Sequence, residues 1–271
     1  VVLRKGRMIT PNDIGLLIAL GMRRVAVARK PRVGILSVGG ELRDIDSPEP
    51  DKVVNNYAYV IAGLVSESGA IPIILGIASD HLEEIVEKIR SHIDELNMVL
   101  TIGGCSVGEK DLVADAVKML GEPGLLTHGV KVVPLKVSGC GSIDGKPIVM
   151  LPGHIVSAVG TFYVFALPLL NVLCGLTPYS RPHPTRVQLD EEMRGKPGID
   201  VFKLLEISVK DGKFVGKPLP WGTNLLSHLI KANGFIIIGA DTTLGKDRMV
   251  EAALFRLPEV KEAAPPVWLK E

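Results

Sequence analysis

Short apolar runs alternate with helical patterns through the first two thirds of this chain of 271 residues. Four runs are rich in Val and Ile and apolar on both faces, which is typical of strands buried in a parallel sheet. Helical spacing between them is clearest over 81–93, where apolar residues recur on one face and charged residues on the other. Strands alternating with helices predict βαβ units and an α/β fold with a mostly parallel sheet. The four runs are residues 32–38, 71–77, 98–102 and 148–151.

Each of the four runs ends in a turn of small or acidic residues. Ligands bind beyond the carboxyl ends of parallel strands, so we expect these turns to gather at one edge. The longest, 103–111, places three glycines before Asp111 and a helical pattern, which offers backbone amides to a phosphate. The other turns are 39–41, 79–80 and 152–154. Three carboxylates at this edge, Glu41, Asp80 and Asp111, would suit a Mg²⁺ ion that bridges to phosphate oxygens.

The pattern changes after residue 176. Three prolines in 177–184 indicate a linker or the opening turn of a second domain. An Asp211-Gly212 hairpin turn and further strand-like runs then predict a small, mainly β domain. The predicted division is a joining segment over 1–30, an α/β domain over 31–176, a β domain over 177–262 and a tail over 263–271.

Composition argues against several classes of function. The net charge is +1, only 4% of residues are aromatic, and Lys and Arg are scattered, so we expect no nucleic-acid partner. Three cysteines form no C-x-x-C pair and no zinc-like spacing with His, which favours a reducing, cytoplasmic location. The chain starts at Val1 without an initiator Met or a signal pattern, which predicts a piece of a longer protein.

One uncharged stretch, 155–176, is long enough to cross a bilayer. Polar residues and Pro168 interrupt it, and a Pro152-Gly153 turn joins it directly to the run at 148–151. A strand-to-helix joint this short is typical of a helix packed on a sheet. We therefore expect a buried helix and no membrane contact.

Several motifs belong to one known pattern. Residues 37–42, Ser-Val-Gly-Gly-Glu-Leu, are similar to S-T-G-D-E-L, and G-G-x-S-x-G-x-x-D stands intact over 103–111. Residues 151–157 are similar to L-P-G-N-P-V-S, and residues 227–234 are similar to S-L-x-x-A-N-G. Residues 5–17 are similar to the segment that precedes the α/β domain in the same proteins. Together they resemble the MoeA and gephyrin E-domain family of molybdopterin molybdotransferases over about residues 5 to 256. The trailing domain separates this family from the related MogA and CinA proteins.

The resemblance implies a fold and a function. The fold would be a three-layer α/β/α sandwich, the MogA/MoeA-like molybdopterin-binding domain, followed by a small β domain like the fourth MoeA domain. The function would be molybdenum cofactor biosynthesis by a transferase that inserts molybdate or tungstate into adenylylated molybdopterin and releases AMP. It implies Mg²⁺ as cofactor, a homodimer, and other molybdenum-cofactor synthesis proteins as candidate partners.

The resemblance also implies site residues. Asp80, Asp111 and Lys136 would be catalytic, and Glu41, Asp80 and Asp111 would hold the metal. The residues that would bind the pterin substrate are Ser37, Gly39, Gly40, Gly103, Gly104, Ser106, Gly108, Pro152, Gly153, Ser157 and Ser227.

The chain departs from the family at several of these places. Gly40 stands where the family has an acid, Val133 replaces the first lysine of K-P-G-K-P, and His154 replaces the Asn of Asn-Pro. Phe202-Lys203-Leu204 lacks the arginine of F-x-R, which removes a family anion-binding group. The family's first two domains are missing, so we expect the chain alone to be incomplete.

Structural explanations and other functions stay open. Asp80 and Asp111 occupy positions where helix N-caps belong, Asn55 heads the next helix as a cap, and Glu41 could be a solvated loop acid. Cys105 is explained by its small size. The alternative functions are a non-catalytic molybdopterin- or nucleotide-binding paralogue and a MogA-like molybdopterin adenylyltransferase that consumes ATP.

Overall fold

The chain folds as two units. The computed structural model describes residues 2–105, 111–179, 182–222 and 224–258. The first unit comprises Val1–Val130 and Val137–Arg181, and the second comprises Lys131–Lys136 and Pro182–Glu271. The division therefore lies five residues beyond the predicted boundary at 176, and residues 131–136 join the second unit, which the sequence pattern did not indicate. The predicted tail at 263–271 lies outside the described residues.

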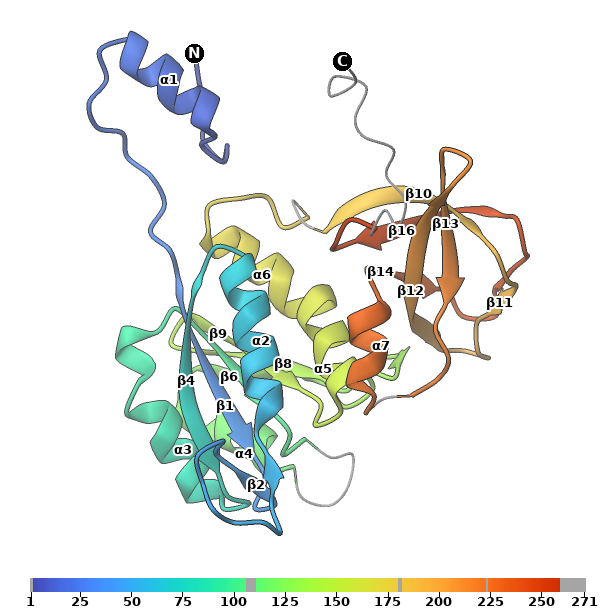
Figure 1. The fold of residues 1–271 in the computed structure, drawn as a ribbon. Helices are drawn as coiled ribbons and strands as arrows, with labels where there is room; N and C mark the ends of the chain where they lie inside the picture. The colour runs from blue at the N-terminus through green and yellow to red at the C-terminus, as the bar shows by residue number, and fades with distance from the viewer. Residues whose placement is uncertain (1, 106–110, 180–181, 223, 259–271) are drawn as a thin grey trace. The chain divides into compact units, whose positions relative to one another are not determined.

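The first unit is built on a six-stranded sheet in the order β4-β1-β5-β9-β8-β6. The strands β4, β1, β5 and β9 run parallel to one another, which confirms the predicted parallel sheet (Figure 1). The strands β8 and β6 extend it in antiparallel pairing and were not predicted. The bounds are β4 Ile71–Ala78, β1 Arg32–Val38, β5 Met98–Ile102, β9 Lys146–Leu151, β8 Gly139–Ile143 and β6 Pro123–His128.

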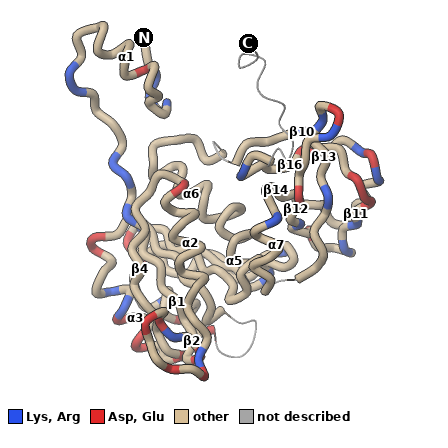
Figure 2. The backbone as a smooth tube through the Cα atoms, viewed as in Figure 1, with Lys and Arg blue, Asp and Glu red and all other residues tan. Residues whose placement is uncertain are grey.

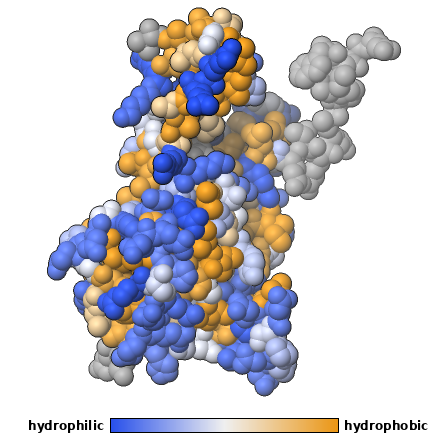
Figure 3. All heavy atoms as spheres, turned by 90° about the vertical axis from the view of Figure 1, so that its left-hand side faces the viewer, coloured by the Kyte–Doolittle hydropathy of each residue, from blue (hydrophilic) through white to orange (hydrophobic). Residues whose placement is uncertain are grey.

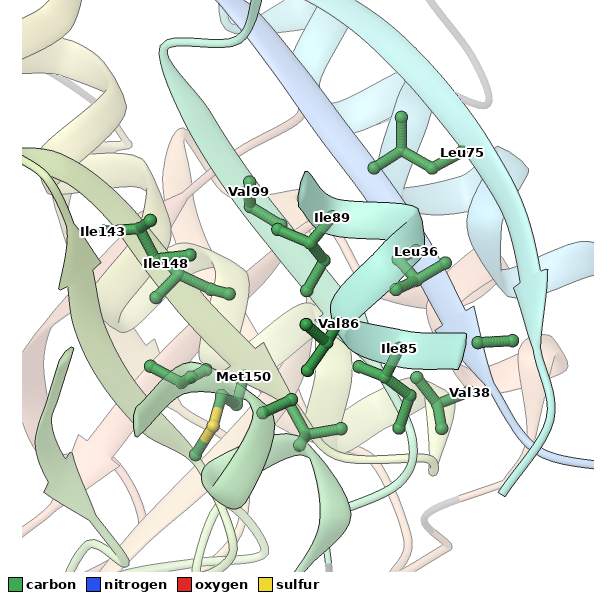
Figure 4. Close-up of a cluster of buried hydrophobic side chains, with 14 of the residues drawn as sticks. Leu36, Val38, Leu75, Ile85, Val86, Ile89, Val99, Ile143, Ile148 and Met150 are labelled. Carbon is green, nitrogen blue, oxygen red and sulfur yellow. The ribbon is translucent and has the colours of Figure 1, made fainter. Parts of the chain in front are cut away.

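Helices cover both faces of this sheet, as the three-layer prediction requires. Side chains alternate along β1, so Leu36 and Val38 face α3 and α4, whereas Ser37 faces α2. The apolar stripe of α3, which includes Ile85 and Ile89, packs onto Leu36 and Val38 and forms a continuous core with strands on either side (Figure 4). The helix bounds are α2 Asn56–Glu67, α3 Leu82–Arg90, the short η1 Ile93–Glu95 and α4 Leu112–Leu120.

The uncharged stretch forms one helix, as predicted. It runs through α5 (Ile155–Thr161), the π-helical turn η2 (Phe162–Ala166) and α6 (Leu167–Leu173). Its 19 residues are long and apolar enough to cross a membrane, but 72% of its apolar window is buried inside the fold. Both α5 and η2 contact the strand β9.

The helix α1 (Pro11–Ala19) precedes the first strand and opens with a capping box. Thr10 Oγ1 accepts from the Asp13 amide, and Asp13 Oδ2 accepts from the Thr10 amide at 2.9 Å. Arg7 forms an ion pair with Asp13 Oδ1 at 2.9 Å. Apolar side chains of this segment lie at the surface (Figure 3), including Ile14, Ile18 and Leu20.

These contacts predict the pH range over which α1 keeps its cap. Hydrogen bonds from Arg7 and Thr10 lower the pKa of Asp13 to about 2. A lowered folded-state pKa means that the stabilisation is present above the unfolded pKa of about 4 and is lost as the pH falls through about 2. NMR shifts of the α1 amides should therefore titrate with a midpoint near pH 2, and Asp13→Asn should abolish that transition. A midpoint near 4 would contradict the cap.

The second unit is mainly β, as predicted. Its sheet has the order β13-β10-β16-β14-β12-β7, and a further pairing of β13 with β12 closes the strands from β13 to β12 into a barrel. The Asp211-Gly212 turn joins β12 to β13, as expected, with both residues at positive φ. The bounds are β10 His183–Leu189, β12 Asp200–Lys210, β13 Lys213–Pro218, α7 Leu226–Lys231, β14 Gly234–Ile238 and β16 Met249–Leu254. Within the second unit, β7 Val132–Val133 pairs with β12, and β11 Met193–Arg194 pairs with β15 Thr243–Leu244. Within the first unit, β2 Leu42–Arg43 pairs with β3 Val53–Val54.

Candidate functional site

The four predicted turns lie side by side at one edge of the first sheet. The order β4-β1-β5-β9 makes each strand end the neighbour of the next, and these strands are parallel. The Gly39 amide donates to Ala78 O at 3.0 Å, and the Gly103 amide donates to Leu151 O at 3.1 Å. These two bonds tie the turns together in pairs, so the loop edge is fixed by backbone contacts.

Two glycines of the longest turn are required by close packing. Gly103 has φ +81°, and a Cβ there would lie 2.5 Å from Val38 O. Gly104 has φ +66°, and its Cβ would lie 2.7 Å from the side chains of Val38 and Val113. A Cβ on Gly153 would meet the Gly103 Cα at 3.5 Å. Absent side chains therefore let three strand-end backbones approach one another closely. Ser106 and Gly108 of the same turn lie outside the described residues.

Asp80 joins two of the turns instead of capping a helix. Its Oδ2 accepts from the Gly40 amide at 2.9 Å. The N-cap position of α3 belongs to His81, which makes no capping hydrogen bond, so the capping prediction for Asp80 was wrong. Glu41 is exposed and its carboxylate folds back over its own turn, since a Cβ on Gly39 would meet its Oε2 at 2.6 Å. Two carboxylates thus border the Gly39-Gly40 backbone.

Asp111 caps α4 and contacts a histidine. Its Oδ1 accepts from the Ala114 amide at 2.9 Å, which confirms the cap. Its Oδ2 lies 2.7 Å from His128 Nε2 at the end of β6, and the Asp111 side chain is only 9% exposed. Sequence reasoning missed His128, because β6 was not among the expected strands. A cation at Oδ2 would share that oxygen with His128 or displace the imidazole.

The carboxylates do not form a ready-made metal cage. Among the described residues, no group of three or more His, Cys, Asp or Glu side chains is placed to hold a metal. Mg²⁺ is usually held by one or two carboxylates together with phosphate oxygens and water. Asp80 and Glu41 border one turn and Asp111 begins the helix after another, and their role toward a Mg²⁺ ion stays a prediction.

Three other predicted residues of this edge are buried. Ser37 donates to Asn55 Oδ1 at 2.8 Å, so its hydroxyl is engaged inside the fold. Asn55 occupies the N-cap position of α2 but makes no capping hydrogen bond, which corrects that expectation. Ser157, within α5, and Pro152 are also buried. These residues lie behind the loop edge and would act on a ligand by supporting the loops.

Two predicted residues belong to the second unit. Lys136 follows the buried Leu135, and Ser227 lies in the first turn of α7; both are exposed. Their contribution to a site shared with the glycine turn stays a prediction.

The Ala-Asn-Gly signature has a structural explanation. Asn233 is 5% exposed, and its side-chain amide both accepts from and donates to the Ile207 backbone at 2.7 Å. A Cβ on Gly234 would meet Ala253 O at 2.8 Å, and Ala232 is fully buried. The signature therefore closes a corner of the barrel.

Cys105 is not suited to nucleophilic chemistry. Burial, with a smaller contribution from the Asp111 charge, raises the pKa of its thiol far above the ordinary range. The thiol stays protonated at neutral pH, in keeping with a residue chosen for size.

An apolar hollow of the first unit lies away from the strand-end turns. It has a volume of about 1150 Å³ and is lined by residues of 2–9 and 17–30, by Glu67–Gly69 and by Cys174–Leu176. None of the predicted site residues lines it. It therefore has no part in the chemistry considered for the strand-end turns.

Comparison with known proteins gives consistent matches. A family model described as a probable molybdopterin binding domain matches residues 34–172. A putative molybdopterin biosynthesis protein of Methanocaldococcus jannaschii is 31% identical over 248 residues, which is 88% of this chain and 58% of that protein. A molybdopterin molybdenumtransferase 2 of Mycobacterium tuberculosis is 30% identical over 246 residues, 89% of this chain and 60% of that protein.

A solved structure matches over both units. The crystal structure of the molybdopterin biosynthesis MoeA protein from Pyrococcus horikoshii OT3 has a TM-score of 0.77 at 26% identity, covering 94% of this chain and 61% of that one. The chain thus spans about 60% of the length of the curated relatives named above.

Proposed function

The chain belongs to the molybdopterin-binding domain family, and we propose that within a full-length protein it inserts molybdate or tungstate into adenylylated molybdopterin and releases AMP. The observation that carries the proposal is the loop edge, where glycine backbones and three carboxylates border one row of parallel strand ends. The MoeA-like likeness over both units supports it, because the second unit accompanies the glycine turn in the solved relative.

Different residues of the loop edge would bind different parts of the substrate and its ion. Backbone around Gly103 and Gly104 would hold the diphosphate, and Lys136 would add a positive charge. Mg²⁺, when bound through Asp80, Asp111 and Glu41, would neutralise charge on the diphosphate. The Gly40 amide holds Asp80, and the Ala114 amide and His128 hold Asp111, so both carboxylates are oriented before a ligand arrives. Attack of water on the phosphoanhydride bond would release AMP, and the two dithiolene thiols would displace one oxygen of molybdate or tungstate as water, so that the metal stays on the pterin.

The proposal also covers assembly and location. Exposed apolar side chains along α1 (Figure 3) support a homodimer. The names of the curated relatives support a place in molybdenum cofactor synthesis, hence a cytoplasmic location and contact with other proteins of that pathway.

Release of AMP tests the proposal directly. The full-length protein should release AMP from adenylylated molybdopterin when molybdate or tungstate and Mg²⁺ are added. Tight binding without AMP, in the presence of all family domains, would instead favour a binding paralogue, to which the replaced residues Gly40, Val133 and His154 point. Consumption of ATP with free molybdopterin would identify an adenylyltransferase.

Asp80 offers a sharper test. Asp80→Asn keeps an oxygen that accepts from the Gly40 amide but removes the charge, so the fold should persist while AMP release falls by about tenfold. Asp94→Asn is the matched control, because Asp94 is exposed in η1 and loses the same charge. Unchanged AMP release in Asp80→Asn would remove Asp80 from the proposed site.

A further inference from the structure

The connection between β6 and β8 belongs to both units. The chain leaves the first unit after Val130 and returns at Val137, and residues 131–136 form part of the second unit. Within this excursion, β7 pairs in parallel with the start of β12. We call residues 129–138 the finger, because two strands of the first sheet flank it and its tip adds a strand to the second sheet.

Apolar packing and a backbone bond hold the tip of the finger in the second unit. Val133 packs against the barrel core, and Leu135 is fully buried. The Asp200 amide donates to the carbonyl oxygen of Lys131 at 3.0 Å. Acidic and basic residues lie side by side around β11 (Figure 2), but among the described residues neither Lys131 nor Lys136 forms an ion pair. The tip is therefore anchored by apolar contacts, which salt does not screen.

The base of the finger is fixed in the first unit. The Gly129 amide donates to Ser138 O at 2.9 Å, which joins the two sides of the finger. Ser138 is 1% exposed, and its hydroxyl oxygen lies 2.7 Å from that of Thr161 in α5. The finger is therefore held at both of its ends.

The residue before the finger contacts the end of the glycine turn. His128 ends β6, and its Nε2 lies 2.7 Å from Oδ2 of Asp111. Asp111 Oδ1 accepts from the Ala114 amide at 2.9 Å and so caps α4. Only residues 129–130 separate His128 from Lys131, whose carbonyl oxygen is bound in the second unit. A short length of backbone thus joins the anchored tip to the cap of α4.

The strand β6 needs support at this end because its pairing is weak. It is the edge strand of the first sheet, and its register with β8 shifts between Leu125 and Thr127. Pro123 and Gly124 at its other end are poor strand formers. An edge strand with an irregular register opens from its end more readily than a central strand does. The finger ties that end to a second folded unit.

We propose that the finger couples the second unit to the N-terminal cap of α4. The anchored tip keeps the end of β6 in place, which holds His128 against Asp111 and thereby keeps the Asp111 carboxylate on the Ala114 amide. Release of the tip would let β6 open from its end, and the contact of His128 with Asp111 would be lost first. Val133 is therefore a positioning residue that acts through His128. This inference does not rest on the proposed transferase reaction.

Hydrogen exchange of the Ala114 amide, followed by NMR, measures opening of the cap. Val133→Ala removes apolar contact with the barrel core and should raise the exchange rate of this amide by about threefold or more. Val133→Ile keeps an apolar anchor and should leave the rate nearly unchanged. Val250→Ala is the matched control, because Val250 is also a partly buried valine packed against this core but lies on β16. It should raise exchange only within the second unit.

A double variant tests the route through His128. His128→Ala removes the contact with Asp111 and should by itself raise the exchange rate of the Ala114 amide. Adding Val133→Ala to His128→Ala should then have no further effect on this amide, because the link is already broken. Trp268→Phe leaves Trp221 as the only tryptophan, so its emission shows whether the second unit stays folded in each variant.

Three results would overturn the coupling. The Ala114 exchange rate could stay unchanged in a folded Val133→Ala protein, Val250→Ala could raise it equally, or Val133→Ala could raise it just as much when His128 is absent. If Val133→Ala unfolds the second unit, Val133→Thr takes its place, because threonine keeps the shape of valine and weakens the apolar contact. No pterin is present in these measurements, so their outcome and that of the AMP-release experiment are judged separately.

Discussion

Replacing Gly103 with alanine should lower the free energy of unfolding by about 2–4 kcal/mol. The left-handed backbone, at φ +81°, costs an alanine about 1–2 kcal/mol. The added Cβ would lie 2.5 Å from Val38 O, closer than real contacts allow. Val38 ends β1, which is held between β4 and β5, so its carbonyl cannot move aside without disturbing both pairings.

A second glycine separates the two contributions. Gly145 has φ +83°, but a Cβ there would have nothing within 4 Å. Gly145→Ala should therefore lower the free energy of unfolding only by the backbone contribution, about 1 kcal/mol. Urea unfolding followed by far-UV circular dichroism, with hydrogen exchange of the β5 amides, compares the two variants. Equal losses in the two would show that close approach at Gly103 does not govern the loop edge.

The parallel sheet was predictable because its signal is local. Runs buried on both faces are almost entirely apolar, as in residues 98–102, where only Thr101 is polar, and each run is followed by a helical pattern. The antiparallel strands β8 and β6 carry no such signal. Gly139 and Gly141 in β8, and Pro123 and Gly124 in β6, resemble turn residues, and only the neighbouring strand makes them a sheet.

The candidate site was predictable only in part, for a similar reason. Glycines with special backbone needs can be read from the sequence, and Gly103 and Gly104 are such residues. Contact partners that lie far apart in the chain cannot be identified from the sequence in this way. Asp80 was interpreted both as a candidate helix cap and as a site residue, but its partner, the Gly40 amide forty residues earlier, could not be identified from the sequence. The contacts of Asp111 with His128, and of Lys203 with Trp221, arise from the fold in the same way.

Asn233→Ala should destabilise the second unit by about 2–5 kcal/mol. The β12–β14 ladder ends where Leu205 pairs with Gly234. Beyond that point the Asn233 side chain takes the place of a strand, because it binds both the N–H and the C=O of Ile207 at 2.7 Å. Alanine would leave these two backbone groups buried and unpaired, and each costs about 1–3 kcal/mol in that state.

Two further variants test this explanation against simple loss of bulk. Asn233→Asp has nearly the same size and can still accept from the Ile207 amide, but when ionised it cannot donate to Ile207 O, so it should also be clearly destabilised. Asn224→Ala removes the same side chain from an exposed position and should change stability by less than about 0.5 kcal/mol. Trp221 emission in the Trp268→Phe background follows unfolding of this unit. If Asn233→Ala unfolded at the same urea concentration as Asn224→Ala, the Ala-Asn-Gly signature would need an explanation other than the barrel corner, and direct contact with a ligand would become the leading one.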